Sequence, residues 1–267
     1  MARVSITAGN YDWKYKKQRY IALIFMTILI LTIITFLTSI ISGVIGMGGG
    51  ILLLSAMTFF LPLQVIIPVH GFVQLVSNST RLLFLKAHIK WSFFGFFVVG
   101  VPFGAGLAAY LLKDVISESF PYLVVSLLIF YSVFKPKRIP HFEVKTWGWT
   151  IVGFLAGITG ILAGAVGPLI APFFIRQDMK KEEVVATKAT MQMVTHFSKI
   201  PVFLYLDFKF EDHSLMILGM ALAAVIGTHY GVKILGKVKE ALFRKLYKGV
   251  LFISGLRLIY KFIEFYV

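Results

Sequence analysis

Two long stretches without a charged residue constrain this chain most. Residues 21–45 and 93–112 are apolar and uncharged, and each matches the roughly 20 residues that an α-helix needs to cross a bilayer core. The chain of 267 residues is 58% hydrophobic and 15% charged, whereas soluble domains are about 45–50% apolar and 25% charged. The sequence therefore predicts an all-α polytopic membrane protein with about seven to nine helical segments.

The charge of the chain is strongly positive. It has 27 Lys and Arg residues against 12 Asp and Glu, a formal net charge of +15, which in a soluble protein would suggest nucleic acid as a partner. Here the basic residues form short clusters between apolar runs, which is the pattern that orients a protein in a membrane. We therefore expect the lipid bilayer, and no nucleic acid, as a partner. The absence of cysteine excludes disulfides and thiolate chemistry.

Segment lengths and charges predict a topology. Helices are expected over residues 20–42, 48–61, 65–85, 91–112, 120–134, 147–163, 165–175, 184–206, 213–231 and 240–262. The basic leader 1–19 and the basic connectors 86–90, 135–145, 176–183 and 233–248 are expected inside, and 113–119 and 207–213 outside. These assignments predict an integral protein of the plasma (inner) membrane with a cytoplasmic N-terminus.

Two of the expected helices, 48–61 and 165–175, are too short to span, and each follows a glycine-rich break. The breaks contain Gly43, Gly46, Gly48, Gly49 and Gly50 in the first case, and Gly157, Gly160, Gly164, Gly167 and Pro168 in the second. A half helix that starts inside the membrane presents unpaired N–H groups and the positive end of its dipole, a combination that binds anions. The alternative is close packing of small residues between helices.

The two halves of the chain resemble each other. An offset of 118 places Gln74 on Gln192, Val76 on Val194, Asn78 on His196 and Arg81 on Lys199. With the expected topology the corresponding helices run in opposite directions, which is the signature of an inverted repeat. We expect a leader (1–19), a first transmembrane repeat with an extra N-terminal helix (20–134), a basic cytoplasmic linker (135–146) and a second repeat (147–267). In the expected topology, residues 20–61 make one net crossing of the membrane, whereas the corresponding residues 147–175 make none. An extra amino-terminal helix in the first repeat would explain this difference.

Each half carries one polar stripe on an otherwise apolar helix. The stripes are His70, Gln74, Ser77, Asn78 and Arg81, and Lys188, Gln192, Thr195, His196 and Lys199, both with spacings of 4, 3, 1 and 3. A charge at the helix centre costs about 2.5–3.5 kcal/mol on insertion scales, so such a stripe faces a water-filled cavity or another polar stripe. The alternatives are hydrogen-bonded packing between helices and, for Arg81 and Lys199, snorkelling to the interface.

Together the breaks and stripes predict a midplane site for a small anion, because neither stripe contains a carboxylate. The candidate substrate-binding residues are Gly48, Gly49, Gly50, His70, Gln74, Asn78, Arg81, Gly167, Pro168, Lys188, Gln192, Thr195, His196 and Lys199. His70 and His196 are also residues that a proton-coupled carrier would use. No metal-ligand spacing, cofactor motif or catalytic pair is present, so no enzyme is expected.

The chain resembles the TauE/SafE family of sulfite exporters and organosulfonate permeases. The resemblance rests on Gly43-x-x-Gly46-x-Gly48-Gly49-Gly50-Ile-Leu-Leu, on Gly160-x-x-x-Gly164-x-x-Gly167-Pro168-Leu-Ile-Ala-Pro172, and on the step Ala186-Thr187. The chain departs from the family pattern at Ser55, at Val69-His70 and at Lys188. The resemblance implies a carrier of sulfite, sulfoacetate or other sulfonates, driven by the proton gradient.

The function that we expect is therefore a secondary transporter of a small anion that works by alternating access. Sulfite or an organosulfonate is implied by the resemblance, and a carboxylate is equally open because Lys188 and His70 add positive charge. The alternatives are a non-transporting scaffold or accessory subunit, and an intramembrane or lipid-modifying enzyme. A homo-oligomer is compatible with the sequence.

Overall fold

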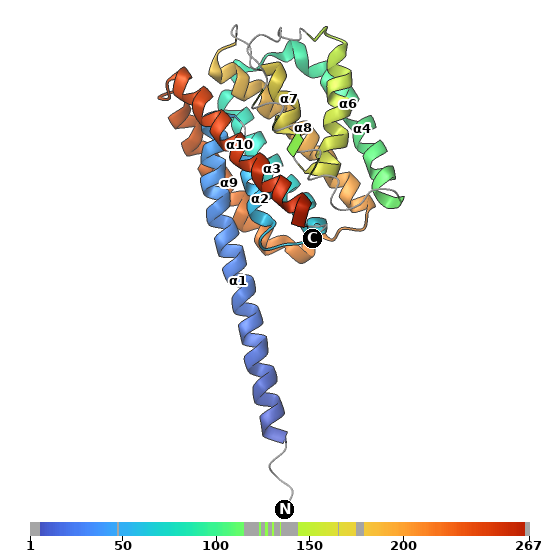
Figure 1. Cartoon of the computed structure of the whole chain (residues 1–267), viewed down its shortest axis with the longest axis vertical. Helices are drawn as coiled ribbons and strands as arrows, with labels where there is room; N and C mark the ends of the chain where they lie inside the picture. The colour runs from blue at the N-terminus through green and yellow to red at the C-terminus, as the bar shows by residue number, and fades with distance from the viewer. Residues whose placement is uncertain are drawn as a thin grey trace, which may run out of the picture.

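The computed structural model describes residues 6–46, 48–114, 144–164, 166–174 and 179–264, together with residues 123, 126, 127, 130 and 134. These residues form helices joined by short turns, and no strand occurs among them (Figure 1). The α-helices are α1 (Ile6–Ile45), α2 (Gly49–Met57), α3 (Leu63–Leu85), α4 (Phe94–Asp114), α6 (Gly148–Ala163), α7 (Gly167–Ile170), α8 (Lys181–Tyr205), α9 (Ser214–Leu235) and α10 (Glu240–Glu264). The short 3-10 turns are η1 (Lys86–His88), η2 (Trp91–Phe93), η3 (Ala171–Phe174) and η4 (Phe210–His213).

The all-helical fold that the sequence predicts is confirmed, and most helix boundaries fall within a few residues of expectation. The amino-terminal helix differs, because α1 begins at Ile6 and not near residue 20. The leader contains no proline before the apolar run, so a helix that has formed there extends through it at little cost. The helix expected over 120–134 lies largely outside the described residues, as do residues 1–5 and 135–143 of the expected leader and linker.

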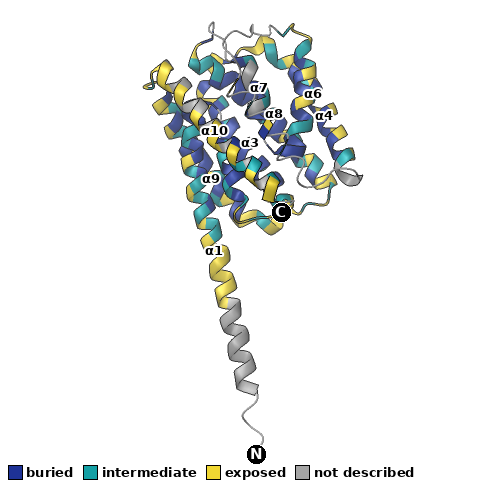
Figure 2. Cartoon of the chain, in the orientation of Figure 1, coloured by how far each residue is buried: buried dark blue, intermediate teal, exposed yellow. Residues whose placement is uncertain are grey.

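The outer surface of the bundle is apolar. Three described helices are long and apolar enough to cross a membrane, in the segments Gln18–Ile45, Trp91–Leu111 and Phe210–Leu235. Large side chains such as Tyr110 and Phe103 are about 70% exposed on this surface, and exposed residues follow the outer faces of the helices (Figure 2). Since water does not favour so much exposed apolar area, the surface is suited to contact with lipid.

Close helix pairs hold the bundle together. The most extensive contacts are those of α4 with α6, α1 with α9 and α3 with α8. Glycines line the first two contacts: a Cβ on Gly43 would lie 2.8 Å from the Cα of Gly231, and one on Gly104 would lie 1.9 Å from the carbonyl oxygen of Phe154. Small residues allow the backbones of membrane helices to approach this closely. The packing interpretation of the glycines is therefore correct for Gly43.

The amino-terminal helix runs in an unexpected direction. Residue numbers increase in the same direction along α1 and α9, because Thr32 lies beside Gly219 and Gly43 lies beside Gly231. The two helices are therefore parallel. The amino end of α1 and the η4 turn consequently lie at one end of the bundle, and η1 lies at the other (Figure 1). The segment 20–61 thus goes out along α1 and returns along α2 without a net crossing.

This path changes the expected topology. A basic leader and the basic connector at η1 cannot share one side of the membrane when they lie at opposite ends of the bundle. In order and relative length, α1 and α2 correspond to α6 and α7, a longer helix followed by a short one.

Candidate functional site

Glycine permits two sharp interruptions inside the bundle. The chain leaves α1 after Ile45 with Gly46 at φ 73° and enters α2 through Gly48 at φ 88°, while Gly164 at φ 70° ends α6 just before α7. Residues with a side chain rarely adopt this left-handed region. The re-entrant half helices are thus present: α2 has 9 residues, and α7 has 4 followed by the η3 turn.

The two polar stripes face each other between these interruptions. Helices α3 and α8 cross at the centre of the bundle, and the rings of His70 and His196 meet there edge to face with centroids 5.8 Å apart. All ten stripe residues are buried, with exposed fractions of 7% or less. The prediction that the polar faces turn inward, away from lipid, is confirmed.

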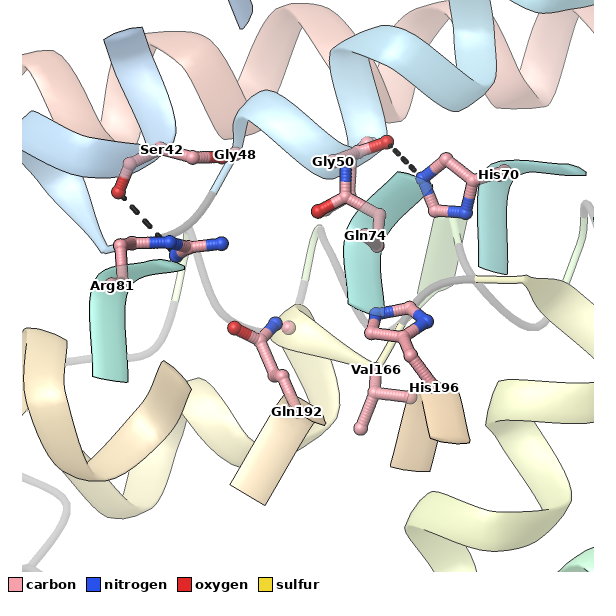
Figure 3. A pocket seen from close by; sticks show the side chains of 11 residues that line it. Ser42, Gly48, Gly50, His70, Gln74, Arg81, Val166, Gln192 and His196 are labelled. Atoms are coloured by element: carbon pink, nitrogen blue, oxygen red, sulfur yellow. Dashed lines mark hydrogen bonds between the residues drawn. The ribbon is translucent and has the colours of Figure 1, made fainter. Parts of the chain in front are cut away.

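A cavity lies between the stripes and the interruptions (Figure 3). Its lining consists of Ser42, Gly48, Gly50, Ile51, His70, Gln74, Arg81, Val166, Gly167, Gln192 and His196. Arg81 and Ser42 lie at one end, and His70 and His196 lie at the other. The volume open to the centre of a water molecule is about 20 Å³, which is room for about one water. The cavity is therefore small in this conformation.

The first glycine break is in direct contact with the α3 stripe. His70 Nε2 donates a hydrogen bond to the carbonyl oxygen of Gly50 over 2.8 Å. A Cβ on Gly50 would lie 3.0 Å from Gln74 Oε1, and one on Gly49 would lie 1.9 Å from the carbonyl oxygen of Thr38. Gly49 thus packs against α1 and lies outside the cavity lining, whereas Gly50 borders the cavity.

Arg81 carries a full charge at one end of the cavity. Its side chain is 1% exposed, and its guanidinium contacts the carbonyl oxygens of Ser77 and Ser42 at 3.4 and 3.5 Å and the Ser77 hydroxyl at 3.5 Å. These distances exceed the 2.7–3.2 Å of good N–H···O hydrogen bonds. Because arginine stays protonated in proteins, a buried cation with only long contacts faces the cavity.

The two lysines of the second stripe are buried behind the lining. Lys199 is 1% exposed and donates a 2.7 Å hydrogen bond to the carbonyl oxygen of Gly164, which places its charge at the negative end of α6. Lys188 is fully buried and lies near enough to Arg81 for their charges to interact. Neither lysine belongs to the cavity lining.

Three further candidates serve their own helices. Asn78 Nδ2 donates to the carbonyl oxygen of Gln74 over 2.7 Å, and Thr195 Oγ1 donates to that of Met191 over 3.0 Å. The packing interpretation is therefore the better one for these two side chains, although Asn78 Oδ1 stays without a hydrogen-bond partner among the described atoms. Pro168 is the second residue of α7, at a position that helices tolerate.

Three lining residues are absent from the sequence-based set: Ser42, Ile51 and Val166. The sequence does carry a signal for Ser42, because Thr35, Thr38, Ser39 and Ser42 form a hydroxyl stripe on α1 and all four are buried. Ile51 and Val166 are apolar residues in an apolar chain, and no sequence pattern distinguishes them.

The charge of the interior has one sign. Among the described residues the buried charged side chains are Arg81, Lys188 and Lys199, and none of them is acidic. Two ion pairs lie at the end of the bundle, where Lys90 meets Glu183 at 2.8 Å and Lys181 meets Glu182 at 3.6 Å. The charged side chains buried around the cavity are thus all basic in the described part of the chain.

Glu183 shows how different the end of the bundle is. Its carboxylate accepts a hydrogen bond from the Lys90 side chain and another from the Lys180 backbone N–H at 3.1 Å. The bond from Lys90, followed by the one from Lys180, lowers the pKa of Glu183. In the described part of the chain, no group of three or more acidic or histidine side chains could hold a metal ion.

The fold and the lipid-facing surface define a polytopic helical membrane protein with a polar cavity in its interior. The model of the family described as sulfite exporter TauE/SafE matches residues 15–258, and the chain belongs to this family. It is similar to a probable membrane transporter protein of Haemophilus influenzae, with 24% identity over 259 residues that cover 85% of this chain and 94% of the relative. No solved structure matches. The family description and the name of the relative both indicate a membrane transporter.

Proposed function

We propose that the protein is a secondary transporter that carries a small anion through the cavity between α3 and α8. The observation that carries this proposal is the charge of the interior: three basic side chains and no acidic one are buried among the described residues. Arg81 has only long contacts at the edge of the cavity, burying such a charge costs several kcal/mol, and an anion in the cavity supplies a counter-charge for it.

The geometry favours an anion over a cation. Arg81 presents a fork of N–H donors suited to a planar or tetrahedral oxyanion, and its present contacts are long enough to be exchanged for shorter ones. Gly48 provides no side-chain cap for α2, so the first N–H groups of that helix point a partial positive charge at the same cavity.

The family makes a sulfur oxyanion the first substrate to test, namely sulfite or an organosulfonate. A short carboxylate is the alternative, because it offers the same charge and the same hydrogen-bond acceptors. Such an ion is larger than the present cavity, so the lining side chains must separate when it enters, as they do when a carrier opens.

Alternating access requires two parts that move against each other, and an inverted repeat would supply them. The offset of 118 that relates Gly46 to Gly164 also relates Ile67 to Val185, and in the structure Gly46 meets Val185 while Gly164 meets Ile67. If α1 corresponds to α6 and α9 corresponds to α4, then the contact between α1 and α9 corresponds to the contact between α6 and α4, and both are among the most extensive in the bundle. These correspondences support two repeats, α1–α4 and α6–α9, related by a pseudo-twofold axis.

We place the protein in the plasma membrane with the end that carries η1 inside, because the connectors at that end hold more Lys and Arg than the leader. The amino end of α1 then lies outside. A cysteine introduced at Arg19 tests this placement: labelling by an impermeant maleimide in intact cells supports it, and labelling only after lysis contradicts it.

The proposed function is tested by the thermal stability of the purified protein in detergent with sulfite, thiosulfate, ethanesulfonate, acetate and chloride at matched ionic strength. A ligand at about a hundredfold its Kd adds about 2.7 kcal/mol to the folded state. We expect one anion class to raise the melting temperature of the wild type and not that of Arg81→Gln.

The matched control is Arg257→Gln, since Arg257 lies on α10 over the ring of Phe59 at 3.8 Å and outside the cavity. This variant is expected to keep the anion response. Uptake of the stabilising anion into proteoliposomes then tests transport itself. Stabilisation without uptake, or no response to any anion, would favour the scaffold alternative.

A further inference from the structure

A pair of hydroxyl groups joins α3 to α9 beside the cavity. Ser77 Oγ on α3 and Thr228 Oγ1 on α9 lie 2.9 Å apart, and both side chains are fully buried. Thr228 belongs to neither polar stripe and lies outside the cavity lining. Its contact with Ser77 is what connects α9 to the candidate site.

The hydroxyl of Thr228 has an unusual partner for this bundle. Five of the described buried threonines donate to the carbonyl oxygen four residues earlier in the same helix, namely Thr35, Thr38, Thr80, Thr190 and Thr195. This is the local bond that a threonine inside a helix commonly makes. Thr228 instead meets a side chain of another helix. Such a bond between membrane helices fixes the partner side chain as well.

Ser77 is in turn the main contact of the Arg81 guanidinium. Arg81 Nε donates to the Ser77 carbonyl oxygen at 3.4 Å, and Nη2 donates to Ser77 Oγ at 3.5 Å. The other nitrogen, Nη1, contacts the carbonyl oxygen of Ser42 at 3.5 Å (Figure 3). Arginine has donors only, so Ser77 Oγ accepts in its contact with Arg81. Contacts therefore run without a gap from Thr228 through Ser77 to Arg81 and the cavity.

One arrangement of the hydroxyl hydrogens suits the guanidinium. A serine hydroxyl has one hydrogen and two lone pairs. When Ser77 donates its hydrogen to Thr228 Oγ1, the hydrogen points away from Arg81 and a lone pair remains for the hydrogen on Nη2. Without the Thr228 hydroxyl, Ser77 can rotate and donate to a carbonyl oxygen of its own helix. Arg81 Nη2 then loses an acceptor that is aimed at it.

Close packing holds Thr228 in place. A Cβ on its neighbour Gly227 would clash with the backbone of α1. One turn further on, a Cβ on Gly43 would lie 2.8 Å from the Cα of Gly231 and 3.0 Å from the carbonyl oxygen of Thr228. Backbones that approach so closely leave α9 little freedom to shift against α1. The Thr228 hydroxyl is thus a fixed partner for the side chain that it meets.

The corresponding residues of the second half are arranged differently. At the offset of 118, Thr195 corresponds to Ser77 and donates to its own helix. Lys199 corresponds to Arg81 and donates a 2.7 Å hydrogen bond to the carbonyl oxygen of Gly164. The cation of α8 therefore has a short backbone bond, whereas the cation of α3 has a supporting hydroxyl and long contacts that an anion can replace.

We propose that Thr228 is a positioning residue for the anion site. Its hydroxyl orients the Ser77 hydroxyl, and Ser77 holds the Arg81 guanidinium with its remaining N–H groups toward the cavity. Thr228 itself does not touch the anion. This inference rests on the proposed function, because it assumes that an anion binds at Arg81. The competing role is packing between α3 and α9, which would affect stability alone.

The test removes the hydroxyl and keeps the shape of the side chain. Thr228→Val does so, and Thr228→Ser restores a hydroxyl. Sulfite, thiosulfate, ethanesulfonate and acetate are each titrated by calorimetry into the full chain in detergent. For the anion that binds the wild type, we expect the Kd to rise about three- to tenfold in Thr228→Val, which is the effect of one lost hydrogen bond. In Thr228→Ser the Kd should stay within about twofold of the wild type.

A double-mutant cycle separates positioning from packing. Ser77→Ala removes the hydroxyl that faces Arg81 and should raise the Kd by a similar factor. Adding Thr228→Val to Ser77→Ala should then change the Kd no further, because the path to Arg81 is already broken. Thr190→Val is the matched control, since Thr190 is 1% exposed, bonds to its own helix and lies outside the cavity lining. It should keep the wild-type Kd.

Uptake of the same anion into proteoliposomes gives a second readout. The KM for uptake should rise in Thr228→Val while the maximal rate stays within about twofold, as expected when binding alone is weakened. An unchanged Kd in Thr228→Val or in Ser77→Ala would overturn the inference and leave the anion site intact. A further rise when the two substitutions are combined would also overturn it. Since Ser77→Ala alone can contradict the proposal, the test does not depend on the folding of Thr228→Val. If none of the four anions binds the wild type, the proposed function fails and this inference with it.

Discussion

The two glycines that open α2 should respond in opposite ways to the same substitution. In Gly49→Ala the new Cβ would lie 1.9 Å from the carbonyl oxygen of Thr38 and 2.3 Å from Ser42 Oγ. In Gly50→Ala the nearest atom would be Gln74 Oε1 at 3.0 Å, the end of a flexible side chain. The new methyl group of Gly49→Ala therefore clashes with the backbone of α1, whereas that of Gly50→Ala contacts a side chain that can move.

The distances set the size of each effect. A carbon atom normally stays about 3.3–3.6 Å from a carbonyl oxygen, so α2 must move away from α1 in Gly49→Ala by more than an ångström. Overpacking of this kind costs about 1–3 kcal/mol, or about 2–12 °C in melting temperature for a chain of this size. Gly50→Ala is expected to cost less than about 1 kcal/mol, because Gln74 can rotate and alanine is a better helix former than glycine.

The binding effects should be reversed. Gly50→Ala displaces Gln74 inside the cavity, and losing one hydrogen bond to a charged ligand costs about 1.5–3 kcal/mol. We therefore expect anion affinity to fall by about tenfold or more in Gly50→Ala, measured by the anion-dependent melting shift. Gly95→Ala is the control, since no atom lies within 4 Å of a Cβ at that position. Equal stability losses in Gly49→Ala and Gly50→Ala would refute the reasoning, as would an unchanged anion response in Gly50→Ala.

Two further predictions concern the second interruption and the end of the bundle. Gly164→Ala is expected to lower the free energy of unfolding by about 1–2 kcal/mol or more, because Gly164 has φ 70° and its Cβ would lie 2.8 Å from Leu54 Cδ1; Gly236→Ala, at φ −57°, should stay neutral in the same melts. Glu183→Gln should lower stability by only about 0.2–1 kcal/mol at neutral pH, since the pair with Lys90 lies at the exposed end of the bundle. The pKa of Glu183 is lowered in the folded state, so the contribution of its carboxylate exists above pH about 4.5 and disappears as the pH falls further; an undiminished difference in melts at pH 3 would contradict this prediction.

The sequence indicates which residues avoid lipid, because that choice depends on local pattern. Apolar runs of bilayer length, glycine clusters and polar residues at helical spacing each have one inexpensive arrangement in a membrane. The inward orientation of the His70 and Lys188 stripes follows from spacing alone, and all ten residues of the two stripes are indeed buried.

The sequence could not separate cavity residues from packing residues within a stripe. Asn78 and Arg81 lie one turn apart on the same face, yet Asn78 bonds back to its own helix at Gln74 while Arg81 reaches the cavity. Lys199 belongs to the same pattern and instead caps the end of α6 at Gly164. These roles depend on where α3 and α8 cross and on how the ends of α1 and α6 meet them, and helical periodicity contains neither quantity.

The direction of α1 is another feature that the sequence does not determine and the tertiary structure does. By itself the sequence determined an all-helical membrane protein with two glycine interruptions and two polar stripes that contain basic residues and no carboxylate, since each of these follows from the cost of placing a given side chain in lipid. Only the tertiary structure decided that α1 runs parallel to α9, that Ser42 and Val166 join the cavity, and that His70 meets His196. Those outcomes depend on contacts between residues far apart in the chain, such as Gly43 with Gly231, and close packing selects them among many pairings of similar apolarity.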